Sequence, residues 1–189
     1  MNANTAPFVF VGNNAAIDFI NTEVINRGHA TDLLKNVADL THWAERAELP
    51  VRGKMTEEDF KEALNLRAAL KFLYSAKMNG NPPSTKSLAI LNAHLAKHLE
   101  QHVLRFMSNE YVLLPAHDGF SISRLLAYLA HEGAILLASH ESSRMKKCSN
   151  PDCVLIFLDT SRNQKRRWCS MDVCGNRSKV STHYRKGQS

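Results

Sequence analysis

The spacing of hydrophobic residues divides the first 140 positions mainly into helices. Apolar side chains recur at steps of three and four residues, which places them on one face of an α-helix. The pattern predicts five helices, over residues 15–28, 31–49, 56–79, 84–99 and 121–140. Side chains able to cap a helix stand at four of the expected starts, namely Thr31, Thr56, Ser84 and Ser121 or Ser123.

Two other segments predict β structure. The apolar run 8–11 is typical of a short strand and ends in a turn at Gly12. Two turn residues separate the apolar segment 102–107 from the segment 110–115, and this arrangement predicts a β-hairpin. The N-terminal domain is therefore expected to be mainly α with a small β-hairpin. The largely apolar fifth helix should be central to its core, and the third helix is expected to bury Phe60, Leu64, Ala68 and Phe72.

All the cysteines of the chain lie in one C-terminal stretch. Cys148 and Cys153 form one pair, and Cys169 and Cys174 form another, with four residues between the members of each pair. Ligand pairs at this separation let one backbone turn present two sulfurs to a tetrahedral zinc ion. Four thiolates close the coordination shell, so the sequence predicts one structural zinc ion and no open position for a substrate. Iron in the same shell is the alternative metal.

The residues between and after the cysteines indicate how the finger is built. Residues 154–160 are typical of a strand leaving the first pair, and 166–169 are expected to return as a second strand. Ser170 can then cap a helix that carries Cys174 near its start. Hairpin, knuckle and a ligand on the first helical turn together predict a treble-clef-like four-cysteine zinc finger.

Charge is distributed unevenly along the chain. Residues 1–143 carry 13 Lys+Arg against 15 Asp+Glu, a net charge of −2. Residues 144–189 carry 11 Lys+Arg against 3 Asp, a net charge of +8. This asymmetry favours a polyanionic partner, with nucleic acid first. Because composition also changes after His140, the sequence predicts two domains, 1–143 and 144–189.

The expected environment is the cytoplasm. The chain contains no run of about 20 apolar residues that could span a membrane. Its N-terminus has no basic region ahead of an apolar one, so no signal peptide is expected. In a reducing compartment, an ordered set of four cysteines favours metal binding over disulfides.

Two sets of motifs resemble known families. The segment RRWCSMDVCGNRSK (166–179), with CSNPDC (148–153) and FLDTSRN (157–163) before it, resembles the CGNR zinc finger; Val154 stands where a glycine is usual. Upstream, IDFINT (17–22), Arg27 and a DLL…DLTHW segment resemble the ABATE domain that commonly precedes this finger. The resemblance implies a bacterial transcription regulator, with a DNA-binding finger and an N-terminal domain that senses a small ligand.

Basic residues of the finger are the expected contacts to DNA phosphates. Arginines and lysines gain affinity by displacing counterions from the phosphates. Trp168 could stack on a base, but packing over the zinc knuckle is favoured for it. Arg177 either contacts phosphate or bonds within the finger, for example to Asp159. The predicted contacts are Arg162, Lys165, Arg166 and Arg167 in the loop and Arg177, Lys179 and Arg185 on the helix that follows.

The N-terminal domain offers one candidate site for a small molecule. Asn21 and Arg27 are polar groups in or just after an apolar helix, and Arg27 could meet an anionic ligand. The alternative, which is favoured, is capping and buried hydrogen bonding. The chain contains no phosphate loop, dinucleotide fingerprint or nucleophile elbow, so no enzyme is predicted. A homodimer with paired fingers, an RNA- or protein-binding module and a thiol redox sensor that ejects zinc are further hypotheses.

Overall fold

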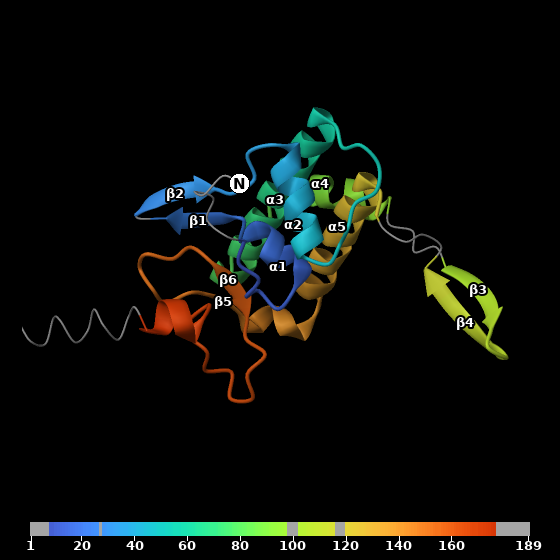
Figure 1. Ribbon diagram of the computed structural model, residues 1–189. Coiled ribbons are helices and arrows are strands. Elements are labelled where there is room, and N and C mark those ends of the chain that lie inside the picture. The colour runs from blue at the N-terminus through green and yellow to red at the C-terminus, as the bar shows by residue number, and fades with distance from the viewer. Residues whose placement is uncertain (1–7, 27, 98–101, 116–119, 177–189) are drawn as a thin grey trace, which may run out of the picture.

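Five helices form the body of the protein in the computed structural model, which describes residues 8–26, 28–97, 102–115 and 120–176. Figure 1 shows them as one bundle, and α1, α3, α4 and α5 pack against one another. The central position predicted for the fifth helix is confirmed, because Leu125, Leu126 and Leu129 are fully buried. The helices are α1 (Ala15–Ile20), α2 (Val37–Arg46), α3 (Glu57–Asn79), α4 (Thr85–Leu95) and α5 (Ile122–Ala138).

Three of the predicted caps begin helices as expected. Thr56 forms a capping box with Asp59, and Ser84 and Ser121 accept hydrogen bonds from backbone N–H groups in the first turns of α4 and α5. Gly80 ends α3 in the left-handed conformation, with φ +68°.

The buried face of α3 differs from the predicted one. Phe60 is buried, but Ala68 is exposed and Phe72 is 53% exposed. Steps of four residues turn a helix by about 400°, so a strict four-residue series drifts around the helix axis. The helix instead buries residues at mixed steps of three and four, among them Ala63, Leu66, Leu70, Leu73 and Tyr74.

The helices predicted over 15–28 and 31–49 are wrong at their facing ends, because residues from 23 to 32 form a β-hairpin instead. The first ends at Ile20, and the chain continues as β1 (Glu23–Asn26), which pairs antiparallel with β2 (His29–Asp32). Val24 lies opposite Thr31 in this hairpin, and β-branched residues of this kind favour strands. Gly28, with φ +83°, takes the turn. The second helix therefore starts only at Val37, capped by Asn36 instead of Thr31.

An ion pair between buried Arg67 and half-buried Asp32 attaches the β1–β2 hairpin to α3. The Arg67 guanidinium, 4% exposed, donates two hydrogen bonds to the Asp32 carboxylate at 2.8 and 2.5 Å. It also donates to the Thr22 hydroxyl at 2.7 Å and lies 3.5 Å from the Glu23 carboxylate. Because Arg67 retains its charge in a protein interior, these acceptors fix the hairpin on the helix.

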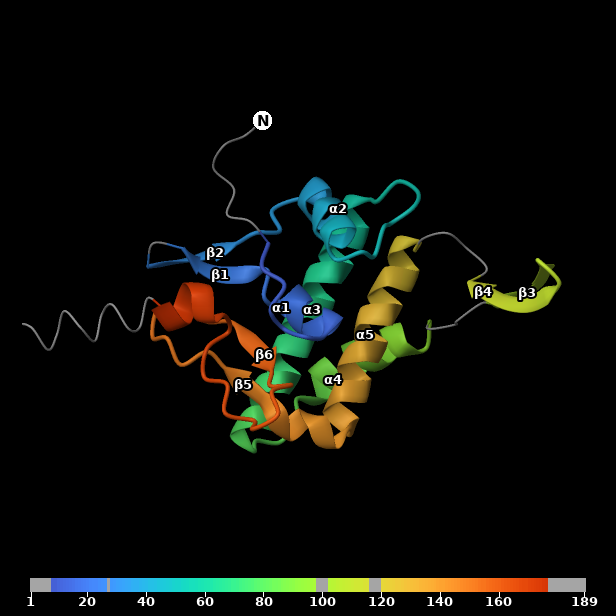
Figure 2. The ribbon, with the colours of Figure 1, turned by 60° about the horizontal axis from the view of Figure 1, so that its bottom comes forward.

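The second hairpin is confirmed as predicted. Strands β3 (His102–Met107) and β4 (Glu110–Pro115) pair antiparallel, and they lie apart from the helical body in Figures 1 and 2. One face carries Leu104, Phe106 and Tyr111, each more than 60% exposed. The side chains of Phe106 and Tyr111 contact each other, with ring centroids 5.0 Å apart. This hairpin thus adds little to the core.

The finger follows α5 through η1 (His140–Arg144) and contains β5 (Met145–Lys147), β6 (Ile156–Leu158) and η2 (Met171–Gly175). The sequence predicts that a strand over 154–160 pairs with 166–169, and this pairing is wrong. The observed strand β6 pairs with β5, and 166–169 is not a strand. The knuckle between Cys148 and Cys153 reverses the chain, so the strands on its two sides become neighbours. The run 8–11 is likewise not a strand, although Val9 and Val11 pack beside the cysteines.

Strand β6 is shared by two hydrophobic cores. Ile156 and Leu158 belong to the main core with the helices, whereas Leu155 and Phe157 pack with the four cysteines. Alternate residues of a strand point to opposite faces, which explains why a continuous apolar run serves both cores. None of the helices in the described ranges combines the length and apolar character that a membrane span requires.

Candidate metal centre and basic surface

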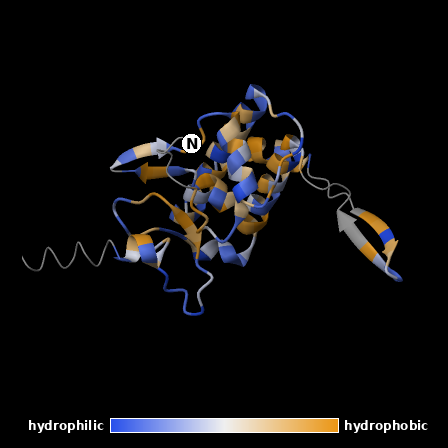
Figure 3. Cartoon of the chain, viewed as in Figure 1, coloured by the Kyte–Doolittle hydropathy of each residue, from blue (hydrophilic) through white to orange (hydrophobic). Residues whose placement is uncertain are grey.

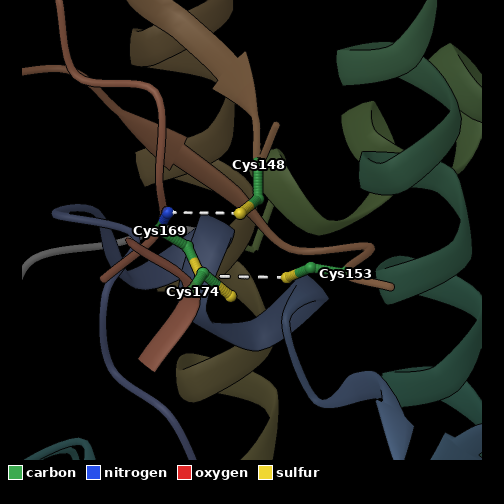
Figure 4. Close-up of side chains that lie close together, drawn as sticks. All are labelled: Cys148, Cys153, Cys169 and Cys174. Carbon is green, nitrogen blue, oxygen red and sulfur yellow. Dashed lines mark hydrogen bonds between the residues drawn. The ribbon is translucent and has the colours of Figure 1, made fainter. Parts of the chain in front are cut away.

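The four cysteines converge on one point. Their sulfur atoms all lie within 4.8 Å of one another, and each residue is at most 8% exposed (Figure 4). Cys148 and Cys153 come from the two ends of the knuckle between β5 and β6, and Cys174 lies on η2. Ser170 caps η2 as predicted, by accepting a hydrogen bond from the N–H of Val173. All four thiols are free of disulfide bonds.

The spacing of the sulfurs fits a tetrahedral zinc ion. Zinc–sulfur bonds of about 2.3 Å place the sulfurs of a tetrahedral site about 3.8 Å apart. The Sγ of Cys169 lies 3.8 Å from that of Cys153 and 3.5 Å from that of Cys174. The backbone N–H of Cys169 donates to the Sγ of Cys148 at 3.4 Å and so joins the two cysteine pairs. The four residues therefore form a site that can hold one structural zinc ion.

Hydrogen bonds between the thiols, together with burial, shift the pKa values of three of the cysteines. The hydrogen bond with Cys169 is the main cause that lowers the pKa of Cys153, to about 5. The same bond, followed by burial, raises the pKa of Cys169 far above its usual range, and burial raises that of Cys174 to about 11. Burial thus opposes ionisation of Cys169 and Cys174, and a zinc ion bound among the sulfurs would supply the positive charge that stabilises thiolates.

Asp159 organises the loop between the cysteine pairs. Its carboxylate is fully buried and accepts hydrogen bonds from the Lys146 ammonium at 2.7 Å and from the Arg166 backbone N–H at 2.9 Å. It also accepts bonds from the hydroxyl and backbone N–H of Ser161, at 2.5 and 3.0 Å. Burial would raise the pKa of Asp159, but these hydrogen bonds, led by that of Lys146, hold it well below its usual range. The sequence gives no signal for this network.

Arg166 is used inside the finger. Its guanidinium lies 4.3 Å from the centre of the Phe157 ring and donates to the carbonyl oxygens of Trp168, at 3.0 Å, and of Cys169. A further bond, 3.2 Å long, reaches the carbonyl of Val11 in the N-terminal segment. The side chain predicted to contact phosphate thus joins the loop, the zinc knuckle and the N-terminal segment.

The other predicted basic residues divide into two groups. Arg162, Lys165 and Arg167 are exposed on the loop, where Arg167 lies over the Trp168 ring at 5.3 Å. Figure 3 shows this loop as a hydrophilic projection below the finger. Trp168 packs against the cysteine cluster, which is the role favoured for it over stacking on a base. Arg177, Lys179 and Arg185, with the helix predicted to carry them, lie outside the described residues.

Asn21 is used inside the protein. Its side chain is buried, donates to the carbonyl of Ile156 at 2.8 Å and accepts from the N–H of Ile156 at 3.0 Å. Both halves of the amide thereby bind β6, in line with the favoured alternative of buried hydrogen bonding. Arg27 lies outside the described residues.

Hollows among the described residues adjoin the finger. The largest, about 820 Å³, runs between the end of α3 and the basic loop, and a second of about 460 Å³ lies beside Arg162 and Trp168. A third, about 270 Å³, is mainly apolar and lies between β1 and the zinc site, lined in part by Val24, Ile25 and Val173.

Comparison with known families agrees with this geometry. The model described as "CGNR zinc finger" matches residues 144–187. The model described as "Putative stress-induced transcription regulator", ABATE, matches residues 13–140, more than half of the chain. No curated protein matches the sequence. The resemblance predicted from the two sets of motifs is confirmed.

Proposed function

The chain belongs to the ABATE family, and we propose that it is a zinc-dependent transcription regulator whose finger binds DNA. The main support for the proposal is the structure of the loop between the cysteine pairs. Asp159 and Lys146 hold its start, zinc holds its end at Cys169, and Arg162, Lys165 and Arg167 stand exposed between them. A rigid loop with exposed cations is suited to phosphate contacts, because little conformational entropy is lost on binding.

Electrostatics supports a polyanionic partner over a neutral one. None of these three cations forms an ion pair with any residue that the structure describes, whereas Lys146 is neutralised by Asp159. Their charge therefore remains available to displace counterions from phosphates, at about 0.9 ion for each phosphate neutralised on duplex DNA. The surplus of +8 over residues 144–189 acts in the same direction.

In this proposal the N-terminal domain controls the finger by direct contact. Several of its groups hold the finger: the amides of Asn13 and Asn21 and the Gly12 carbonyl bind β6, and the Val11 carbonyl binds Arg166. A change in α1 or in the segment before it would therefore shift the basic loop. We place a small apolar effector in the hollow between β1 and the zinc site, because its occupant would touch both parts. Val24→Phe would fill that hollow. The variant should therefore abolish any stabilisation of the protein that such an effector confers.

The test is selection from a random duplex DNA library by the full-length, zinc-loaded chain. The proposal predicts enrichment of a defined motif, and preference for that duplex over structured RNA and an acidic polypeptide in competition. Cys169→Ser should abolish the enrichment, because it removes a zinc ligand. Equal weak binding to all three competitors, or an enriched motif that survives Cys169→Ser, would refute a zinc-organised DNA reader. Preferential binding of RNA would establish the alternative module.

A further inference from the structure

We propose that the DNA-binding surface extends beyond the finger into the hollow of about 820 Å³, where the end of α3 forms a second wall facing Lys147. This inference rests on the proposed function and deepens it: the helical domain and the finger together hold one phosphodiester strand. Lys147 and the residues of α3 were not among the sequence-predicted contacts.

The charge of the hollow points to a phosphate chain. Five of the residues that line it are lysine or arginine, and none is acidic. Two of the five, Lys146 and Arg166, have their charged groups bound within the chain. The other three, Lys147, Lys165 and Arg167, are exposed and form no ion pair within the described ranges.

The opposite wall is uncharged and combines polar side chains with Met78. Ser75 and Asn79 line it from the last turns of α3, and Ser149 adds a hydroxyl from the knuckle. Asn79 donates to the Ser75 hydroxyl at 3.3 Å, and both residues are exposed. Amides and hydroxyls of this kind are common partners of phosphate oxygens and carry no sequence preference. The basic wall formed by the finger and the uncharged wall formed by α3 are together suited to one strand of nucleic acid backbone.

The hollow continues into the predicted loop surface. The hollow beside Arg162 and Trp168 shares Lys165, Arg166 and Arg167 with the larger one, so the two adjoin. Together they form a basic track from the end of α3 past the loop to Met171 at the start of η2. Cations line both hollows, which favours a phosphodiester chain over a single free phosphate.

Two variants of the full-length, zinc-loaded chain test the inference, one on each wall. Lys147→Gln removes a cation, and Asn79→Asp places a carboxylate opposite it. Each should weaken binding to the selected duplex, and Lys147→Gln should reduce the log–log salt slope by about 1. Asn65→Asp makes the same chemical change at an exposed position of α3 outside the hollow and should leave binding unchanged. Zinc content and thermal stability report whether each variant is folded.

The outcomes separate this inference from the proposed function. If the wild type binds the duplex while Lys147→Gln and Asn79→Asp leave affinity and salt slope unchanged, the inference is overturned and the proposed function stands. If the wild type does not bind DNA, both are overturned. Stabilisation of the wild type by inorganic pyrophosphate, lost in Lys147→Gln while DNA affinity is unchanged, would assign the hollow to a free anion and overturn the inference.

Discussion

The side-chain amide of Asn21 forms two hydrogen bonds with the backbone of Ile156, 135 residues away, at 2.8 and 3.0 Å. It occupies the place of a neighbouring strand beside β6, and thereby joins the end of α1 to the finger. Because β6 also contributes to both hydrophobic cores, the finger and the helical domain share one structural element. Zinc binding, folding and the position of the basic loop are therefore expected to depend on one another.

Asn21→Ala should destabilise the protein by roughly 2–4 kcal/mol, because it leaves a buried N–H and a buried carbonyl of Ile156 without partners. Urea unfolding of the zinc-loaded protein measures the change. Asn92→Ala, at an exposed position of α4, is the matched control and should lie within about 0.5 kcal/mol of the wild type. Equal stability of the two variants would show that the Asn21 bonds contribute nothing.

Removing zinc should lower the unfolding temperature of the helices as well as that of the finger. Chelation separates the knuckle from η2, releases β6 and so exposes Ile156 and Leu158 of the main core. Thermal unfolding followed by helical circular dichroism, with and without a chelator, measures this coupling, and metal analysis should give one zinc per chain. A helical transition that keeps its midpoint after complete zinc removal would contradict the shared core.

Part of this architecture could be predicted from the sequence because its determinants are local. Thr56, Ser84 and Ser121 stand directly before the helices that they cap, and the cysteine pairs carry their ligand spacing within six residues each. The contacts of Asn21 and Arg67 join residues far apart in the chain, so no local pattern announces them. The β1–β2 hairpin was predicted as helix because Ile17, Ile20 and Val24 also fit helical spacing, and the pairing that decides between the two is tertiary.

Asp32→Asn should destabilise the protein by about 3 kcal/mol, because it leaves the Arg67 guanidinium buried with only the more distant Glu23 as a charged partner. Glu58→Gln removes the acid of an exposed pair, that of Glu58 with Lys61, and should cost at most about 1 kcal/mol. Chemical denaturation of both variants at pH 7 provides the comparison. Similar losses in the two would show that the Arg67 network is energetically equivalent to a surface pair.

Asp18 should make stability fall as pH rises from about 4 to about 6. Burial raises the pKa of Asp18 from 3.8 to about 6, although the N–H groups of Gly12 and Val11 lower it. The folded carboxyl therefore holds its proton more tightly than the unfolded one, and this contribution is complete below pH 4 and lost above pH 6.

The comparison of the wild type with Asp18→Asn isolates that contribution, because zinc loss in acid affects both proteins. The free energy of unfolding of the wild type should drop by roughly 2–3 kcal/mol relative to that of the variant between pH 4 and pH 7. Denaturation series at closely spaced pH values measure the difference. A difference that is constant with pH, or that rises toward neutral pH, would contradict the raised pKa.

The salt dependence of DNA binding by two matched triple variants of the zinc-loaded chain tests whether the loop cations form the DNA-binding surface. One removes the loop cations (Arg162→Gln, Lys165→Gln, Arg167→Gln), and the other removes the same charge from exposed positions of the helical domain (Lys61→Gln, Lys86→Gln, Lys97→Gln). We predict that the loop variant keeps its zinc, binds the selected duplex far more weakly and loses about 2.7 from the log–log salt slope, whereas the helical variant binds nearly as the wild type does. Equal slopes and affinities in the two variants would contradict a DNA-binding surface organised by the zinc site.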